Sequence, residues 1–279
     1  MIAAPRLLAP VMVLLLTLLA GCMLVPGRFV SELDLRRDGT FSFTYRGEIH
    51  LLAMSRLMNQ NRAAPADFSP LPCRSDENGE ERACSRAEID AQRREWQEER
   101  DRTEASRRKE NEQMKAMLGG LDPDDPRAAE DLAQRLRRQV GWKRVDYKGD
   151  GLFDVDFALS GTLGHDFRFP TIERFPLDNA FVQVALRADG SVRVDAPGFG
   201  PGTGGEPWRN MMQMAALAGD DKAAPRAPVI DGTFTIRTDG AVLSNNTDEG
   251  PQAGTTGQQL AWTINARTSA VPMAVIRLR

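Results

Sequence analysis

The chain has 279 residues and a formal net charge of −3. Its length suits one large domain or two small ones. A charge so close to neutral argues against a nucleic-acid partner and against a general electrostatic attraction to anionic lipid.

The N-terminus has the three-part pattern of an exported lipoprotein. A single positive charge at Arg6 precedes an almost wholly apolar stretch over 7–19, which is too short to span a bilayer comfortably. The stretch ends in Leu19-Ala20-Gly21-Cys22, which resembles the bacterial lipobox. The resemblance implies cleavage before Cys22 and a diacylglyceryl thioether on its sulfur. A plain secretory signal with an incidental cysteine, and an N-terminal membrane helix, remain as alternatives.

These features predict a signal peptide over 1–21 and a lipid-anchored tether over 22–28, with the membrane as the partner of the lipid on Cys22. Met23 follows the cysteine, where an inner-membrane retention signal usually has Asp. The lipoprotein resemblance therefore implies the outer membrane, with the chain facing the periplasm, in preference to the inner membrane.

Two further cysteines, Cys73 and Cys84, lie eleven positions apart in a polar, proline-containing stretch. An oxidising periplasm favours a disulfide between them, since each is the other's available partner. A metal site is not expected, because neither His50 nor His165 neighbours a cysteine in the sequence.

An Asp-Gly pair separates two β-rich stretches at four points in the chain. Asp-Gly supplies the positive φ angles that tight hairpin turns require, and alternating flanks give each strand one buried face. The pattern predicts an antiparallel sheet built from four hairpins: 29–36 with 40–49, 143–147 with 152–159, 181–187 with 191–195, and 232–238 with 241–244. Two closing strands are expected at Leu260–Ile264 and Met273–Leu278.

Between the first two hairpins the sequence favours helices. Leu51–Met58 is expected to be a short helix, and Ser85 with Glu88 forms a capping-box pattern ahead of a highly charged helix that runs to about Leu118. We expect this helix to be solvated, and a partner-binding arm remains a second interpretation. Ala128–Val140 is expected to be an amphipathic helix that packs on the sheet through Leu132, Leu136 and Val140.

The order of short motifs resembles the LppM-type domain of bacterial membrane-anchored lipoproteins, and also lipoproteins of α-proteobacteria such as sphingomonads. The motifs are Asp38-Gly39-Thr40, Val140-Gly141-Trp142, Lys148-Gly149-Asp150-Gly151, Leu243-Ser244-Asn245-Asn246 and Leu260-Ala261-Trp262. The likeness covers Phe29–Leu51 and most of Ala128–Leu278. It implies an LppM-like domain over 29–279 with a helical insertion at 52–120, and a non-enzymatic envelope module. The expected fold class is α+β.

Two groups of residues could in principle form a catalytic site. Ser160 near His165 and Asp166 lacks the Gly-x-Ser-x-Gly elbow of a hydrolase. Asp154 and Asp156 share a strand face, but their alternation with Phe153, Val155 and Phe157 favours a solvated face.

The remaining patterns are weaker still. The glycines over 198–205 lack the spacing of a phosphate loop. Met211, Met212 and Met214 are more simply one face of a helix packed into a core than a copper site. The loop of Phe175-Pro176, with Glu173 and Arg174 before it, could line a binding surface.

The sequence therefore predicts no catalytic, cofactor-binding or metal-binding residues. It predicts a non-catalytic binding or structural role, with an envelope protein, a lipid or a glycan as partner. The alternative is a periplasmic enzyme of unrecognised type.

Overall fold

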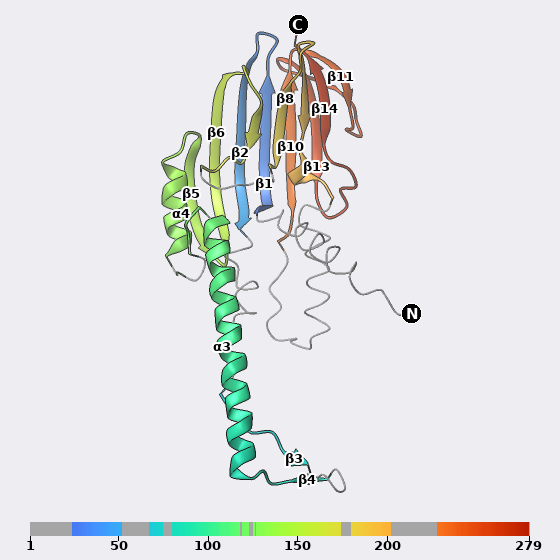
Figure 1. Ribbon diagram of the computed structural model, residues 1–279. Coiled ribbons are helices and arrows are strands. Elements are labelled where there is room, and N and C mark those ends of the chain that lie inside the picture. Colours follow the sequence, from blue (N-terminus) through green and yellow to red (C-terminus); the bar gives the residue numbers. More distant parts are fainter. Residues whose placement is uncertain are drawn as a thin grey trace, which may run out of the picture.

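The computed structural model describes residues 24–51, 67–74, 80–117, 119–122, 125, 127–173, 180–201 and 228–278. Among these residues 45% lie in strands, which form three sheets of seven, five and two strands, and 22% are helical. The two larger sheets form the body shown in Figure 1. The predicted α+β class is therefore wrong, because the fold is mostly β. None of the helices in the described ranges is both long and apolar enough to cross a membrane.

The seven-stranded sheet has the order β12-β13-β10-β1-β2-β6-β5. Its strands are β1 (Leu24–Leu35), β2 (Thr40–Leu51), β5 (Trp142–Gly149), β6 (Leu152–Thr162), β10 (Asp231–Thr238), β12 (Gln252–Gly254) and β13 (Gly257–Ile264). Two predicted hairpins, β1–β2 and β5–β6, are confirmed as antiparallel pairs. At the second turn Asp150 and Gly151 both have positive φ angles, of 51° and 73°. This is the conformation for which Asp-Gly is favoured.

The five-stranded sheet has the order β11-β14-β9-β8-β7. Its strands are β7 (Phe167–Phe169), β8 (Val182–Leu186), β9 (Ser191–Asp195), β11 (Ala241–Asn245) and β14 (Met273–Arg277). The third predicted hairpin, β8–β9, is confirmed. Its turn is closed by Asp189, whose Oδ1 accepts hydrogen bonds from Ser191 N at 2.9 Å and Ser191 Oγ at 2.6 Å.

The fourth predicted hairpin is wrong. β10 pairs with β1 on one side and with β13 on the other, so both of its edges are occupied. The chain after Asp239-Gly240 therefore crosses to the second sheet, where β11 pairs with β14. The two closing strands expected from the sequence are β13 and β14. They lie in different sheets and do not pair with each other.

The sequence predicts an antiparallel sheet, but the seven-stranded sheet contains one parallel pair. β1 and β10 run parallel, in register from Arg28 opposite Asp231 to Leu35 opposite Thr238. A parallel pair needs a long crossover between its strands. Local turn signals carry no information about such a pairing.

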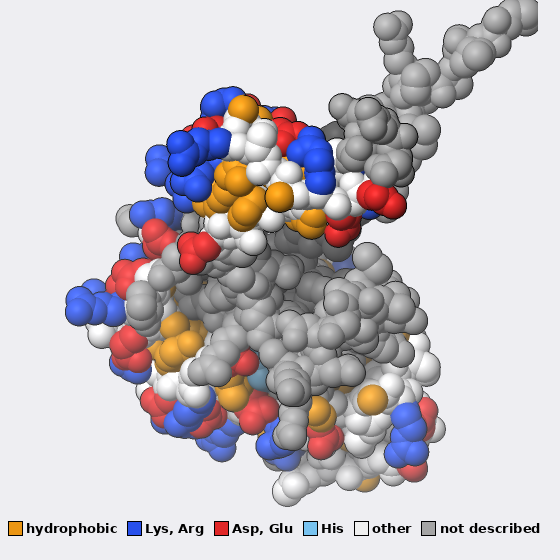
Figure 2. Space-filling view, turned by 90° about the horizontal axis from the view of Figure 1, so that it is seen from below, with side chains coloured by type: hydrophobic (Ala, Val, Ile, Leu, Met, Phe, Trp, Pro, Cys, Tyr) orange, Lys and Arg blue, Asp and Glu red, His pale blue; other side chains and the backbone are white. Residues whose placement is uncertain are grey.

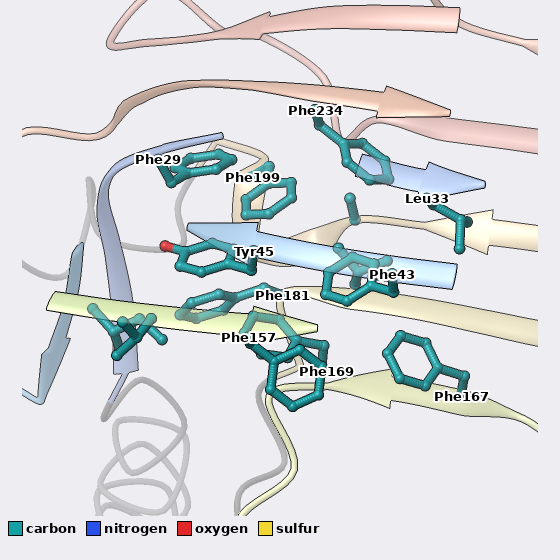
Figure 3. Close-up of a cluster of buried hydrophobic side chains, with 14 of the residues drawn as sticks. Phe29, Leu33, Phe43, Tyr45, Phe157, Phe167, Phe169, Phe181, Phe199 and Phe234 are labelled. Atoms are coloured by element: carbon teal, nitrogen blue, oxygen red, sulfur yellow. The ribbon is translucent and has the colours of Figure 1, made fainter. Parts of the chain in front are cut away.

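Aromatic side chains fill the space between the two large sheets. Phe43, Tyr45 and Phe234 from one sheet and Phe169 from the other are fully buried, together with Phe181 just before β8 and Phe199 in the short 3-10 helix η3 (Pro197–Phe199) (Figure 3). The Phe29 and Phe199 rings stack at 4.3 Å between centroids, and Phe157 and Phe169 lie 4.7 Å apart. The alternating side chains of β2 and β6 thus point into a shared core, as the sequence predicts.

The tether expected over 22–28 is too long, because β1 begins at Leu24. Leu24, Val25 and Pro26 pair with the end of β2, opposite Leu51 to Ile49. Leu24 and Val25 are only 3% and 1% exposed. Residues 24–28 therefore belong to the sheet.

Helix α4 (Ala128–Arg137) lies against β5. Its apolar face buries Leu132, Leu136 and three alanines, and Arg137 Nε donates a hydrogen bond to Val145 O at 2.8 Å. The prediction that Val140 belongs to this face is wrong, because the helix ends at Arg137 and Val140 is 82% exposed.

Helix α3 (Arg86–Met117) is the other α-helix of the described ranges, and it projects from one end of the sandwich (Figure 1). The capping box at its start is confirmed: Ser85 N donates to Glu88 Oε2 at 2.8 Å, and Glu88 N donates to Ser85 Oγ at 3.3 Å. Leu51 is the last residue of β2, so the short helix expected at Leu51–Met58 cannot begin there. The rest of that predicted helix lies outside the described residues.

Candidate functional site

The first candidate region is the far end of α3, where the chain before the helix folds back on it. Cys73 and Cys84 are joined by a disulfide, with 5.1 Å between their Cα atoms, as expected from the sequence. Cys73 begins β3 (Cys73–Arg74), which pairs with β4 (Glu81–Arg82), and Cys84 lies two residues after β4. We call the described residues 67–74 and 80–100 the stapled tip.

Gln92 holds the proline-rich segment of the stapled tip against the helix. Its Oε1 accepts a hydrogen bond from Leu71 N at 2.9 Å, and its Nε2 donates one to Leu71 O at 3.2 Å. The Leu71 side chain is left 72% exposed. Phe68 packs edge-on against Trp96 at 5.8 Å, and Arg93 and Arg100 lie over these two rings at 5.1 and 4.8 Å.

Glu88 orders the start of the helix in the stapled tip. Arg82 donates hydrogen bonds to both of its carboxylate oxygens, at 2.6 and 3.0 Å. These bonds, with those from Ser85, lower the pKa of the Glu88 carboxyl to about 2. The carboxylate is therefore held in its charged form as a structural group.

The second candidate region is an open cleft of about 400 Å³ between the chain after β11 and the loop from β13 to β14. Its lining is mainly polar. Asp248 and Glu249 come from one wall and Arg267 from the other, with Thr268 and Ser269 beside the arginine. Carboxylates, a guanidinium and hydroxyls within one cleft suit a ligand rich in hydrogen-bonding groups.

Asn246 fixes the shape of this cleft. Its Oδ1 accepts hydrogen bonds from Trp262 Nε1 at 3.1 Å and from Met273 N at 2.9 Å. Its Nδ2 donates to Val271 O at 2.8 Å. One side chain thus ties the end of β11 to β13 and to the start of β14. Asn246 and Trp262 both occur in the short motifs noted in the sequence, but those motifs predict no role for either residue. Their separation by sixteen positions gives no local signal of contact.

The candidate catalytic groups are not brought together. Ser160 is exposed on β6, and His165 is exposed in the following loop, where its Nδ1 lies 3.0 Å from Asp166 O. Asp166 Oδ1 instead accepts a hydrogen bond from Leu186 N at 3.1 Å. Ser160 is thus a strand residue, and Asp166 ties the start of β7 to β8.

Asp154 and Asp156 lie on the solvated face expected for them, and each pairs with an arginine. Arg144 Nη1 lies 2.7 Å from Asp154 and 2.9 Å from Asp146, and Arg46 lies 3.4 Å from Asp156. Hydrogen bonds to Asp154 and Asp146 raise the pKa of Arg144, and the bond from Arg144 lowers that of Asp146. On this face the aspartates are therefore paired with neighbouring arginines.

The other sequence candidates can be placed only in part. Gly198 packs so closely on Phe181 that an added Cβ would lie 2.5 Å from Phe181 Cα, which explains this glycine by packing. Glu173 N donates to Gln139 Oε1 at 3.3 Å. The remaining candidates lie outside the described residues: Cys22, Arg174 to Pro176, the glycines over 202–205 and the three methionines. Within the described ranges, no three His, Cys, Asp or Glu side chains are grouped to hold a metal ion.

No family model matches the chain, and no curated protein matches its sequence. Among solved structures, the chain is similar to the folded domain of LppM from Mycobacterium tuberculosis, determined by NMR. The TM-score is 0.29 and the sequence identity 15%, over 92% of this chain and 91% of that one. The expected resemblance to LppM-type lipoproteins thus has a weak structural counterpart. A likeness of this strength carries over neither a site nor a function.

Proposed function

We propose that the chain is a lipoprotein of the bacterial cell envelope, anchored through a lipid on Cys22, with a non-catalytic binding role at the periplasmic surface of the membrane. The lipobox sequence at residues 19–22 supports the anchor. Met23 supports the outer membrane over the inner one, as the lipoprotein pattern implies.

The observation that carries the proposal is the start of β1 at Leu24. Two extended residues span at most about 7 Å, so a lipid on Cys22 would hold the sandwich directly at the bilayer. A chain that begins its central sheet at the anchor suits a module that works at the membrane surface.

The polar cleft around Asn246 supports binding as the activity. Its three charged side chains, Asp248, Glu249 and Arg267, are exposed. A general acid or base works best with a pKa tuned toward neutrality, commonly by burial. An exposed, polar cleft is better suited to recognition of a hydrogen-bonding partner, such as a glycan or a polar protein segment.

Cross-linking in intact cells tests the binding role. A photoreactive amino acid at Ser269, on the cleft wall, is expected to yield a discrete adduct in the membrane fraction. The matched control is the same amino acid at Leu186, which is 41% exposed on β8 and does not line the cleft. The Ser269 adduct should also be lost on Arg267→Ala. Equal adducts from both positions, or none from Ser269, would contradict the proposal.

A further inference from the structure

The position of the proposed anchor relative to the fold follows from the start of β1. Leu24 pairs with Leu51, the last residue of β2, at the lower end of the sandwich in Figure 1. Cys22 stands two residues earlier, within about 7 Å of Leu24 along an extended chain. The surface of a bilayer that holds a lipid on Cys22 therefore passes close to this end.

Helix α3 projects from the same end of the sandwich (Figure 1). The chain just after its C-terminal end lies beside α4, because Arg135 Nη1 donates to Gly119 O at 3.2 Å, and Lys115 of α3 pairs with Asp122 of the same connecting segment at 3.8 Å. At 1.5 Å per residue its 32 residues extend about 48 Å from this junction. A bilayer placed squarely across this end would be entered by the helix, whereas a bilayer that runs alongside the helix axis would meet it along its length.

The charges of α3 prevent it from entering the hydrocarbon region. Nine of its residues are basic and nine are acidic, and each charge is costly at the centre of a bilayer. Neighbouring charges pair along its surface, as Arg100 does with Glu104 at 3.7 Å and Arg102 with Glu98 at 3.5 Å. A helix of this kind at a membrane must lie in the aqueous or headgroup layer.

The stapled tip at the far end of α3 has the composition of a membrane interface. Leu71 is presented to solvent by Gln92, beside the Phe68–Trp96 pair. Aromatic rings concentrate at the headgroup level, and arginines can keep their charged ends in water while their stems cover apolar surface. Seen from this end of the molecule, hydrophobic side chains gather beside Lys and Arg side chains (Figure 2).

We propose that α3 lies along the bilayer surface and that the stapled tip is a second membrane contact, with Leu71, Phe68 and Trp96 in the headgroup region. The proposal rests on the lipid at Cys22, which fixes where the bilayer is. The balanced charges of α3 give no net attraction to anionic lipid. The contact therefore depends on the apolar side chains and on the local concentration that the anchor provides.

Quenching of Trp96 by brominated lipid tests this contact. The lipidated mature protein, carrying Trp208→Phe throughout, is reconstituted into phosphatidylethanolamine–phosphatidylglycerol vesicles with or without lipid brominated just below the headgroup. Trp142 and Trp262 are 5% and 9% exposed inside the sandwich, out of reach of lipid. We expect quenching in brominated vesicles that disappears on Trp96→Phe and falls on Leu71→Asp.

Two checks separate the possible failures. The mass of the reconstituted protein shows whether the lipid is present, and an absent lipid contradicts the proposed function itself. Leu71→Asp changes an exposed side chain, and retention of the Cys73–Cys84 disulfide shows that the stapled tip is intact. A vesicle-bound, lipidated protein whose Trp96 is not quenched overturns the second contact and leaves the anchor standing. That result would be obtained if the stapled tip docks on a protein instead.

Discussion

Phe169→Ala is expected to lower the free energy of unfolding by about 3–5 kcal/mol, the usual cost of removing a fully buried ring. Phe169 is fully buried in β7 and lies within about 6 Å of five other rings: Phe43, Tyr45, Trp142, Phe157 and Phe181. It therefore joins both sheets and the start of β5. Its removal would open a cavity that none of these rigid rings can fill. Urea denaturation followed by circular dichroism measures the change.

The matched control is Phe41→Ala. Phe41 is only partly buried, at the rim of the same core, and contacts Phe167 at 5.3 Å between centroids. Its loss should cost less than half as much, because the site is open to solvent. Equal destabilisation by the two variants would show that Phe169 is not the centre of the sandwich.

Asn246→Ala is expected to lower the free energy of unfolding by about 1–2 kcal/mol, because Trp262 Nε1 and Met273 N lose their acceptor at a partly exposed site. The loop from β13 to β14 would also lose its bond from Asn246 Nδ2 to Val271 O. Hydrogen exchange of the Met273 amide should rise together with the loss of stability.

The neighbouring Asn245→Ala is the control for this substitution. The Oδ1 of Asn245 accepts hydrogen bonds from Thr247 N and Thr247 Oγ1, within a local turn. Its removal should cost less than about 1 kcal/mol, since no second strand depends on it. If Asn245→Ala proved as damaging as Asn246→Ala, the link between the sheets would have to lie elsewhere.

Three of the four Asp-Gly hairpins could be predicted from the sequence because a hairpin is a local structure. Its turn residues and the alternation of its flanks lie within about twenty positions. The Asp239-Gly240 pair has the same local pattern, yet β10 has no free edge for β11. Which strand occupies an edge is decided by pairings such as Arg28 with Asp231, which are two hundred positions apart.

The α+β class was wrong because strands outweigh helices, at 45% against 22% of the described residues. The sequence indicates that strands are present, but it does not show whether they share one sheet or divide between two. The short strand of Phe167 and Phe169 lacked a turn signal and was not predicted, although Phe169 lies at the centre of the core. Val140 followed the helical spacing of Leu132 and Leu136, but the chain leaves the helix before reaching it.

Features of the candidate sites could be predicted where they depend on residues close in sequence, and not where they depend on distant residues. The disulfide between Cys73 and Cys84 and the capping box at Ser85 could be predicted, since both depend on residues close in sequence. The bond from Trp262 to Asn246 could not, because it joins β13 of one sheet to the residue that follows β11 of the other. The expected tether failed because no composition change marks the start of β1 at Leu24.

The mass of the N-terminal peptide of the mature protein tests the proposed anchor most directly. Digestion after Arg28 should release a peptide that begins at Cys22 and carries a diacylglyceryl group, and Cys22→Ala should leave an unprocessed precursor without lipid. Loss of both Cys73 and Cys84 is the matched control, and it should leave the lipid in place. A mature chain that begins elsewhere, or a Cys22 peptide without lipid, would contradict the placement of the sandwich at a membrane surface.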